Sequence, residues 1–465
     1  MKKTRVAIAA LLLASMSMTM FACGDKEESS YKSLDSATAA EVAEIAAEDS
    51  RLTGELENKT IKWMANWDIN PDSSGKEPPI ELAIFQSRYG GVVEWHSVDW
   101  GTRYDSLANA VNGGEGIDFF PASDLDAFPK GAIKDMFAPI DDYIDFSKDL
   151  WADTKDVMDQ FTWGGKHYVI VNAVSGDNCA LIYNKTTIEE NGLKDPAELL
   201  EKGEWNWNTF QEQLEQFVDV ENGFYGLDGY WFENGLSRST GVPYIGIENG
   251  KLVSNLKDPS LERLQNWFFE LSTNNLVAIG CGDFGWSEMP QYIGEGKELY
   301  FPAGLWKLYS TPEQWEPVFG DAEDVMFVPV PKDPESDTYY IPCGLDGYVM
   351  VKGGQNPEGV IKFAECKRVT ITNERADAIA TEQLYDVYGW TEEMVQMKIK
   401  MDEMARANPV YDFYTGTSAD VTKILDSSEN GIRTATKGQI QWSETVGTIS
   451  SAIDAYLAEY NASQN

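Results

Sequence analysis

The sequence predicts an α/β protein with two lobes, and three observations lead to this fold class. From residue 60 onward, short runs typical of β-strands alternate with runs of helical spacing, the pattern of a parallel sheet with helices on both faces. Residues 55–465 exceed the roughly 250–300 residues that a single core supports. Aromatic and acidic side chains follow the ends of the strands, where α/β sheets bind ligands.

The first lobe begins with a strand–helix–strand–helix–strand unit. We expect strands at residues 60–65, 92–98 and 116–122 and helices at 78–90 and 101–114. Parallel strands place their carboxyl ends at one edge of the sheet, and ligands bind beyond that edge. Trp67, Asp68 and Asp124 follow the first and third of these strands and are therefore candidate ligand contacts.

The N-terminus has the layout of a secretory signal peptide. Three cationic residues precede an apolar run at 6–14 that is too short to span a bilayer, and small residues lead to Cys23. This arrangement resembles the lipobox of bacterial lipoproteins, in which Cys23 becomes the lipid-bearing first residue of the mature protein. We expect residues 1–22 to be removed and residues 23–54 to form a lipid anchor and flexible tether, with a short helix near 39–48. The lipid is then the only link to the membrane.

Charge and composition exclude several classes of function. The formal charge is −39, and removing the signal peptide with its three cations makes it −42, which disfavours binding to nucleic acid. Only two histidines are present, His96 and His167, which argues against zinc sites and most Ser-His or Cys-His catalysis. No metal and no cofactor is expected. The cysteines that follow Cys23 show no metal-binding spacing, and we expect free, mostly buried thiols at Cys179, Cys281, Cys343 and Cys366.

The fifteen tryptophans fall into two groups. Trp267 lies on an amphipathic helical pattern, and Trp205 and Trp207 precede a helix with Asn208 as its expected N-cap, so these three are expected in the core. Others follow strands beside carboxylates. They are Trp67, Trp231 and Trp306, with Tyr230 next to Trp231. An aromatic face beside a carboxylate suits a sugar, because the ring covers the C–H face and the acid binds hydroxyls. The same pair also suits an alkylammonium cation.

Ordered segments from residue 60 to 460 make the chain resemble the family-1 extracellular solute-binding proteins of ABC importers, the maltose-binding-protein type. They include GEGIDFFPASDLDAF, APIDDYIDF, ALIYNKTTIEENGL, WNWNTFQEQL, GEGKELYFPAGLW and GLDGYVMVKGGQNPEGVIKFAECK. The resemblance implies a type II periplasmic-binding-protein-like fold with ligand in the interlobe cleft. It places the N-terminal lobe at 55–174 plus about 344–385, and the C-terminal lobe at 175–343 plus about 386–465.

The resemblance also implies roles for individual residues. The expected ligand contacts are Trp67, Asp68, Asp124, Asp177, Tyr230, Trp231, Trp306, Asp346 and Trp442, with Asp126 as a weaker candidate. Crossings between the lobes are expected at residues 168–178, at 341–347 and after Tyr385.

The function implied is that of an extracytoplasmic receptor, not an enzyme. It acts as a monomer, captures a carbohydrate, most simply an oligosaccharide, by lobe closure, and delivers it to ABC permease subunits. Two alternatives remain open at this point. One is a receptor of the same fold for a polyamine-like cation, which needs opposed carboxylates in the cleft. The other is an extracytoplasmic glycosidase with two catalytic acids.

Overall fold

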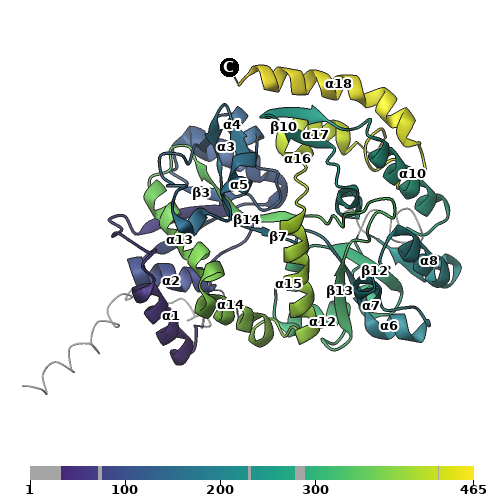
Figure 1. Ribbon diagram of the computed structural model, residues 1–465, viewed down its shortest axis with the longest axis horizontal. Helices are drawn as coiled ribbons and strands as arrows, with labels where there is room; N and C mark the ends of the chain where they lie inside the picture. The colour runs from purple at the N-terminus through teal and green to yellow at the C-terminus, as the bar shows by residue number, and fades with distance from the viewer. Residues whose placement is uncertain (1–32, 72–75, 229–231, 278–287, 428, 465) are drawn as a thin grey trace, which may run out of the picture.

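The computed structural model describes residues 33–71, 76–228, 232–277, 288–427 and 429–464, and it consists of two α/β lobes (Figure 1). The first lobe lies on the left of Figure 1 and the second on the right, with β7 and β14 running between them. The predicted fold class is confirmed. No helix in the described part of the chain has the length and apolar character that crossing a membrane requires.

The first lobe is built on a six-stranded sheet with the order β2-β1-β3-β14-β4, in which β7 also pairs with β14. Its strands are β1 (Thr60–Ala65), β2 (Val92–Ser97), β3 (Phe119–Pro121), β4 (Phe137–Ala138), β7 (Val169–Ser175) and β14 (Gly344–Val351). Its helices are α1 (Ser36–Glu48), α2 (Ile80–Tyr89), α3 (Arg103–Gly113), α4 (Lys130–Ile133), α5 (Lys155–Met158), α13 (Pro357–Thr372) and α14 (Glu374–Asp386). A small hairpin joins β5 (Thr162–Trp163) and β6 (Lys166–His167). β1 runs parallel to β2 and β3, as predicted, whereas β14 is antiparallel to β3.

The second lobe is built on a four-stranded sheet with the order β13-β8-β12-β9. Its strands are β8 (Ala180–Asn184), β9 (Tyr225–Leu227), β12 (Glu298–Ala303) and β13 (Val325–Pro329), and a separate hairpin joins β10 (Ile245–Glu248) and β11 (Lys251–Ser254). Its helices are α6 (Lys185–Glu190), α7 (Pro196–Glu201), α8 (Trp207–Phe217), α9 (Phe232–Ser237), α10 (Pro259–Thr273), α11 (Gln291–Gly294) and α12 (Pro312–Phe319). The C-terminal segment adds α15 (Glu392–Ala407), α16 (Tyr414–Thr417), α17 (Ala419–Leu425) and α18 (Trp442–Ala462).

The N-terminal helix α1 corrects the prediction of a flexible tether up to residue 54. α1 begins at Ser36, where the Asp35 carboxylate caps it, and it packs against α2 and α14. Val42, Ile45 and Ala46 share one face of the helix and are buried. This apolar stripe is enough to dock α1, although most of its other residues are polar or small.

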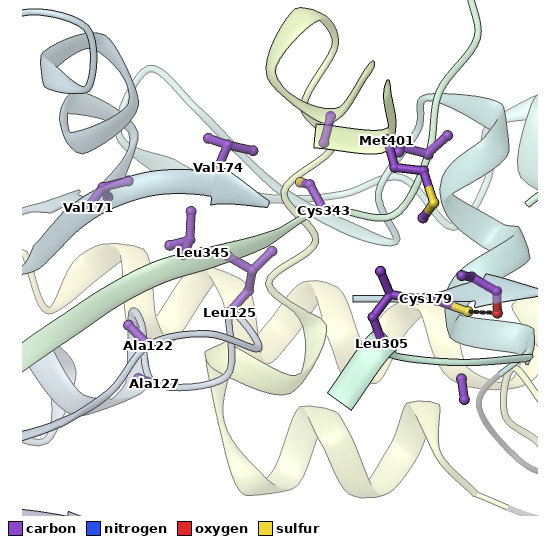
Figure 2. Packing of buried hydrophobic residues seen from close by; sticks show 14 of the residues in the cluster. Ala122, Leu125, Ala127, Val171, Val174, Cys179, Leu305, Cys343, Leu345 and Met401 are labelled. Carbon is purple, nitrogen blue, oxygen red and sulfur yellow. Dashed lines mark hydrogen bonds between the residues drawn. The ribbon is translucent and has the colours of Figure 1, made fainter. Parts of the chain in front are cut away.

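The chain crosses between the lobes three times. It leaves β7 for β8 through residues 176–179, leaves β13 for β14 through 330–343, and passes from α14 to α15 through 387–391. A buried apolar cluster fills the space where the crossings meet, as Figure 2 shows. Its members come from both lobes and include Leu125, Val174, Cys179, Leu305, Cys343, Leu345 and Met401. The apolar core is therefore continuous through the joint between the lobes.

Several side-chain predictions can be compared directly with the structure. Trp205, Trp207 and Trp267 are buried, as expected, but the N-cap of α8 is Asn206 instead of Asn208. Asn206 forms a capping box with Thr209, because its side chain accepts backbone N–H groups that lack helical partners. Cys179, Cys343 and Cys366 are free and buried, as predicted; Cys281 lies outside the described residues.

Candidate functional site

The strand ends of the two sheets face the same interlobe junction. In the first sheet, Leu345 N donates to Ser123 O, so the carboxyl end of β3 lies beside the start of β14, which follows the second crossing. In the second sheet, Ala303 at the end of β12 pairs with Ala180 at the start of β8, which follows the first crossing. Loops that follow β1, β3 and β12 therefore lie next to the hinge.

A cavity of about 300 Å³ opens at this edge of the first lobe. It is lined by Trp63, Trp67, Ile69, Lys76, Pro79, Glu81, Pro121, Ser123, Leu345, Asp346, Gly347, Tyr348 and Lys367. The lining combines aromatic rings with charged groups. Trp67 is half-buried and meets the buried ring of Trp63 edge to face, with ring centroids 5.4 Å apart. The cavity thus offers aromatic surface beside hydrogen-bonding groups, the combination that was predicted for this loop.

Lys367 of α13 holds two of the acids that line the cavity. Its Nζ lies 2.9 Å from Glu81 Oε1 and 3.2 Å from Asp346 Oδ2. Burial by itself lowers the pKa of the Lys367 ammonium, but Asp346 and Glu81 outweigh burial and raise this pKa well above its usual range. Asp346 also accepts a hydrogen bond from Asn172 Nδ2 at 3.2 Å. Asp346 therefore shares the Lys367 ammonium with Glu81, and it lines the cavity as an acceptor that Lys367 and Asn172 hold in place.

The loop after β3 carries a second group of polar side chains. Asp124 is half-buried, and loss of hydration raises its pKa to about 7; the charge of Asp126 adds to this rise, whereas Arg103 opposes it. The Arg103 guanidinium donates to the Asp126 carboxylate, and this pair is buried. Near neutral pH the Asp124 carboxyl group can therefore accept a hydrogen bond from a hydroxyl group when it is ionised, or donate one when it is protonated. Asp126 is occupied as the partner of Arg103.

Trp306 is an exposed aromatic residue of the second lobe and a candidate for stacking on a ligand. It follows β12 in a 3-10 turn, η6 (Leu305–Lys307), and its side chain is 46% exposed. Its ring lies over Gly304, where a methyl group would overlap the ring atoms. Leu305 N donates to Asp177 O at 3.0 Å, which ties this turn to the first crossing. The ring is therefore exposed, yet it is held beside the hinge.

Asp177 sits at the first crossing, and its carboxylate contacts two other elements. Tyr309 Oη donates to Asp177 Oδ2 at 2.6 Å, and Lys398 Nζ of α15 lies 3.5 Å from Asp177 Oδ1. Lys398 also contacts Asp402 Oδ2 at 2.7 Å, and Asp402 Oδ1 accepts from Gly176 N at 2.8 Å. In this structure Asp177 thus links the first crossing to the third.

The structure places the predicted ligand contacts in different positions relative to the cavity and the junction. Trp67 and Asp346 line the cavity, and Asp124 and Trp306 lie at the strand ends that face the junction. Asp68 lies next to the cavity loop and accepts from Asn70 N and Nδ2, both at 2.9 Å. Tyr230 and Trp231 lie outside the described residues, as does Cys23. Whether any of them touches ligand stays a prediction.

The structure does not support the predicted ligand contact of Trp442. It begins α18, is only 1% exposed, and packs against Tyr244 with ring centroids 5.9 Å apart. Its Nε1 donates to Leu256 O at 3.1 Å. α18 packs on α10 and β11, and Trp442 is part of the contact that holds it there. Both the ring and the N–H group of Trp442 have partners inside the core, so no face of the ring is open to a ligand.

Lys367, Glu81 and Lys398 were missed by the sequence analysis. Glu81 is buried on α2, whose other buried positions are apolar, so a charge on that face was a usable signal. Lys367 is half-buried on α13, which also buries Lys362, Glu365 and Arg368, so its charge did not stand out. Their partners are far away in sequence, so the pairing itself could not be read from local patterns.

Replacing Trp306 by Ala is expected to weaken ligand binding by about 1–3 kcal/mol, because a large exposed ring loses its stacking contact. The melting temperature should change little, since the ring is not part of the core. Gly304→Ala is a matched test. The backbone at Gly304 (φ −71°, ψ 152°) suits alanine, so its effect comes from displacing the ring. Calorimetric titration of both variants with a ligand of the unchanged protein checks this expectation. Unchanged affinity in both variants would remove Trp306 from the site.

Solved structures of known proteins share this two-lobed architecture. Three solved structures illustrate the likeness: an ABC substrate-binding protein from Listeria monocytogenes in complex with cycloalternan, an ABC transporter-associated binding protein from B. animalis subsp. lactis in complex with β-1,6-galactobiose, and a cyclo/maltodextrin-binding protein complexed with maltotetraose. Their sequence identities are 17%, 15% and 15%, and their TM-scores are 0.59, 0.60 and 0.59. The alignments cover 87%, 87% and 88% of this chain and 99%, 98% and 98% of those chains. At such identities the likeness concerns the fold.

A search of curated proteins found no match. The family model described as bacterial extracellular solute-binding protein matches residues 67–366, more than half of the chain. The match spans β2, β3 and the first two crossings, together with the loops that carry Trp67, Asp124, Asp177 and Trp306. The chain belongs to the bacterial extracellular solute-binding protein family.

Proposed function

We propose that this protein is the carbohydrate receptor of an ABC importer. The observation that carries the proposal is the pairing of aromatic and polar groups on both sides of the interlobe junction. Trp67 and Asp124 follow strands of the first lobe, and Trp306 follows a strand of the second. Aromatic faces cover the C–H faces of sugar rings, while half-buried carboxyl groups bind hydroxyls. The sugars named for the three similar structures support the same class of ligand.

The charges at the junction favour a neutral sugar over a polyamine. A polyamine needs opposed carboxylates that are free of other cationic partners, whereas Asp177 already contacts Lys398 and Asp346 already contacts Lys367. A cation entering the junction would have to compete with these two lysines for the carboxylates. A sugar needs no net charge and can use the same carboxylates as acceptors.

A thermal-shift screen tests the proposal. Glucose, malto-, cello-, xylo- and galacto-oligosaccharides are compared with putrescine and spermidine. A sugar at about 100 times its dissociation constant should stabilise the protein by about 2.7 kcal/mol. Stabilisation by the polyamines alone would establish the cation receptor instead. Chromatography of each sugar after prolonged incubation should show it unchanged, and a hydrolysis product would establish the glycosidase.

Lipid attachment at Cys23 belongs to the same proposal. The apolar run at 6–14 and the small residues before Cys23 favour cleavage at that residue, and the polar segment after it separates the lipid from the folded body. Such an anchor holds the receptor near its permease in the membrane, where a single copy of the chain is sufficient to present ligand.

Cys23→Ala is expected to release a folded, ligand-binding protein into the medium. Fractionation of cells that express either form, followed by binding assays on the soluble fraction, checks this result. Cys179→Ala is the matched control, because this thiol is free and buried at the first crossing. If the Cys23 variant remains with the membrane, the anchor is not at this residue.

A further inference from the structure

Trp100 is an exposed indole at the same sheet edge as the loop of Trp67. It begins the 3-10 turn η1 (Trp100–Thr102), three residues after β2, and its side chain is 43% exposed. β2 pairs with β1 in parallel from Thr60 with Val92 to Ala65 with Ser97, so the two carboxyl ends lie side by side. Neighbouring strands are about 4.8 Å apart, which makes the loops that follow them adjacent.

Three hydrogen bonds tie the end of β1 and the loop that follows it to β2 and to the residue after β2. Val98 N donates to Ala65 O at 3.2 Å, and Trp95 Nε1 donates to the same oxygen at 3.0 Å. Asn70 Nδ2 from the Trp67 loop also donates to Val93 O at 3.0 Å. The two loops are therefore fixed relative to each other, and Trp100 continues the edge on which Trp67 lies.

The Trp100 ring is held from one side by a buried cation. The guanidinium carbon of Arg103 lies 3.3 Å from the ring centroid, a cation–π contact. Arg103 is itself only 7% exposed, and it donates to both Trp100 O and the Asp126 carboxylate. The guanidinium is thus anchored in the protein and fixes the indole from behind. Such support reduces the entropy that the ring loses when a ligand stacks on it.

From this geometry we propose that Trp100 forms a second carbohydrate-stacking position, which binds the outer end of an oligosaccharide. The proposal rests on the carbohydrate function proposed above and deepens it. The cavity beside Trp67 measures about 300 Å³, the lower end of the range for ligand pockets, so a longer chain must continue outside it. β2 is the edge strand of the sheet, and Trp100 therefore lies on the outward side of the Trp67 loop.

Asp99, the residue before Trp100, supplies a polar group to the second stacking position. Asp99 is exposed and directly precedes Trp100 in the chain, so the same loop carries an exposed carboxylate as well as the exposed ring. This is the same aromatic–carboxylate pair that marks Trp67 with Asp68. The class of ligand that fits is a neutral sugar unit with one C–H face toward the indole and its hydroxyls toward the acid.

The test measures how affinity depends on chain length. The malto-, cello-, xylo- and galacto-oligosaccharide series, from one to six units, are titrated calorimetrically into the full-length mature protein and into its Trp100→Ala variant. The position predicts equal affinity for the shortest sugars that bind and about tenfold weaker binding of the longer ones, or roughly 1.4 kcal/mol. Trp100→Phe, which keeps an aromatic ring, should recover part of the loss for long chains only.

Tyr143→Ala is the matched control, because Tyr143 is a comparably exposed aromatic residue near β4 at the other end of the same sheet. It should leave the affinities for all lengths unchanged. If Trp100→Ala binds every length as tightly as the unchanged protein, the second position does not exist, while the receptor function stands. If the unchanged protein binds no sugar of any series, the carbohydrate proposal itself fails, and the second position with it.

Discussion

Trp267→Ala is expected to lower the free energy of unfolding by about 3–5 kcal/mol, the usual cost of truncating a buried large aromatic side chain. Trp267 is 8% exposed and lies flat against Trp207, with ring centroids 4.8 Å apart and an interplanar angle of 8°. Its Nε1 donates to Gln211 Oε1 at 2.9 Å, so the variant loses a hydrogen bond as well as packing.

Chemical denaturation followed by circular dichroism measures this effect. The transition of a two-lobed protein need not be two-state, so the midpoint is compared across several probes. Trp306→Ala is the control, because it removes the same side chain from an exposed position and should leave the midpoint nearly unchanged. Equal losses for the two variants would contradict the division of the tryptophans into core and binding residues.

Lys398→Met is the second substitution that we expect to lower the free energy of unfolding strongly. Removing this ammonium leaves Asp177 and Asp402 facing each other at the hinge without a cation, and breaking a largely buried ion pair in this way costs about 3–5 kcal/mol. Burial alone lowers the pKa of Lys398, but the two carboxylates outweigh burial and raise that pKa. The lysine is therefore charged at neutral pH, and its loss acts as a charge deletion.

Lys400→Met is the matched control on the same helix. Lys400 pairs with Glu201 on the exposed surface, and such pairs contribute roughly 0–1 kcal/mol. Thermal unfolding of both variants should show a large decrease for Lys398→Met and little change for Lys400→Met. Similar melting temperatures for the two variants would show that the Asp177–Lys398–Asp402 contacts do not hold the crossings together.

Local patterns predicted the regular elements of the first lobe well. The strand expected at residues 60–65 is β1, and the helix expected at 78–90 is α2, which starts later because Pro79 takes the N-cap position. The strand expected at 116–122 shortens to Phe119–Pro121. Directly before this strand, Asp118 N donates to Lys62 O, and the Asp118 carboxylate accepts from Lys62 N, Gln355 N and Asn356 N.

The errors arose where long-range contacts decide the structure. The segment 24–54 contains few large apolar residues, and only a short helix near 39–48 was expected in it. Val42, Ile45 and Ala46 nevertheless dock α1, and Arg375 reinforces the contact by pairing with Glu41 and Glu44. Trp442 was placed at the ligand because of its position before the last helix, but the packing of α18 on α10 and β11 buries it.

The acidic residues of the site show the same limit. Asp177 lies at the first crossing, as expected, whereas Asp346 was expected in the second crossing and lies inside β14. The partners of both residues could not be predicted. Lys398 lies 221 positions from Asp177 in the chain, and only the folded arrangement of α15 against β7 brings them together. Sequence patterns therefore identified which loops face the junction, while the charge state of those loops required the structure.

Closure of the lobes over a sugar is the central claim, and small-angle X-ray scattering tests it most directly. The three crossings permit a rigid-body rotation, and a ligand that contacts both lobes only in the closed form must shift the population toward it. The radius of gyration should fall when a saturating sugar from the thermal-shift screen is added, and it should fall less for Trp306→Ala at the same sugar concentration. A bound sugar that leaves the radius of gyration unchanged would contradict closure and the receptor mechanism built on it.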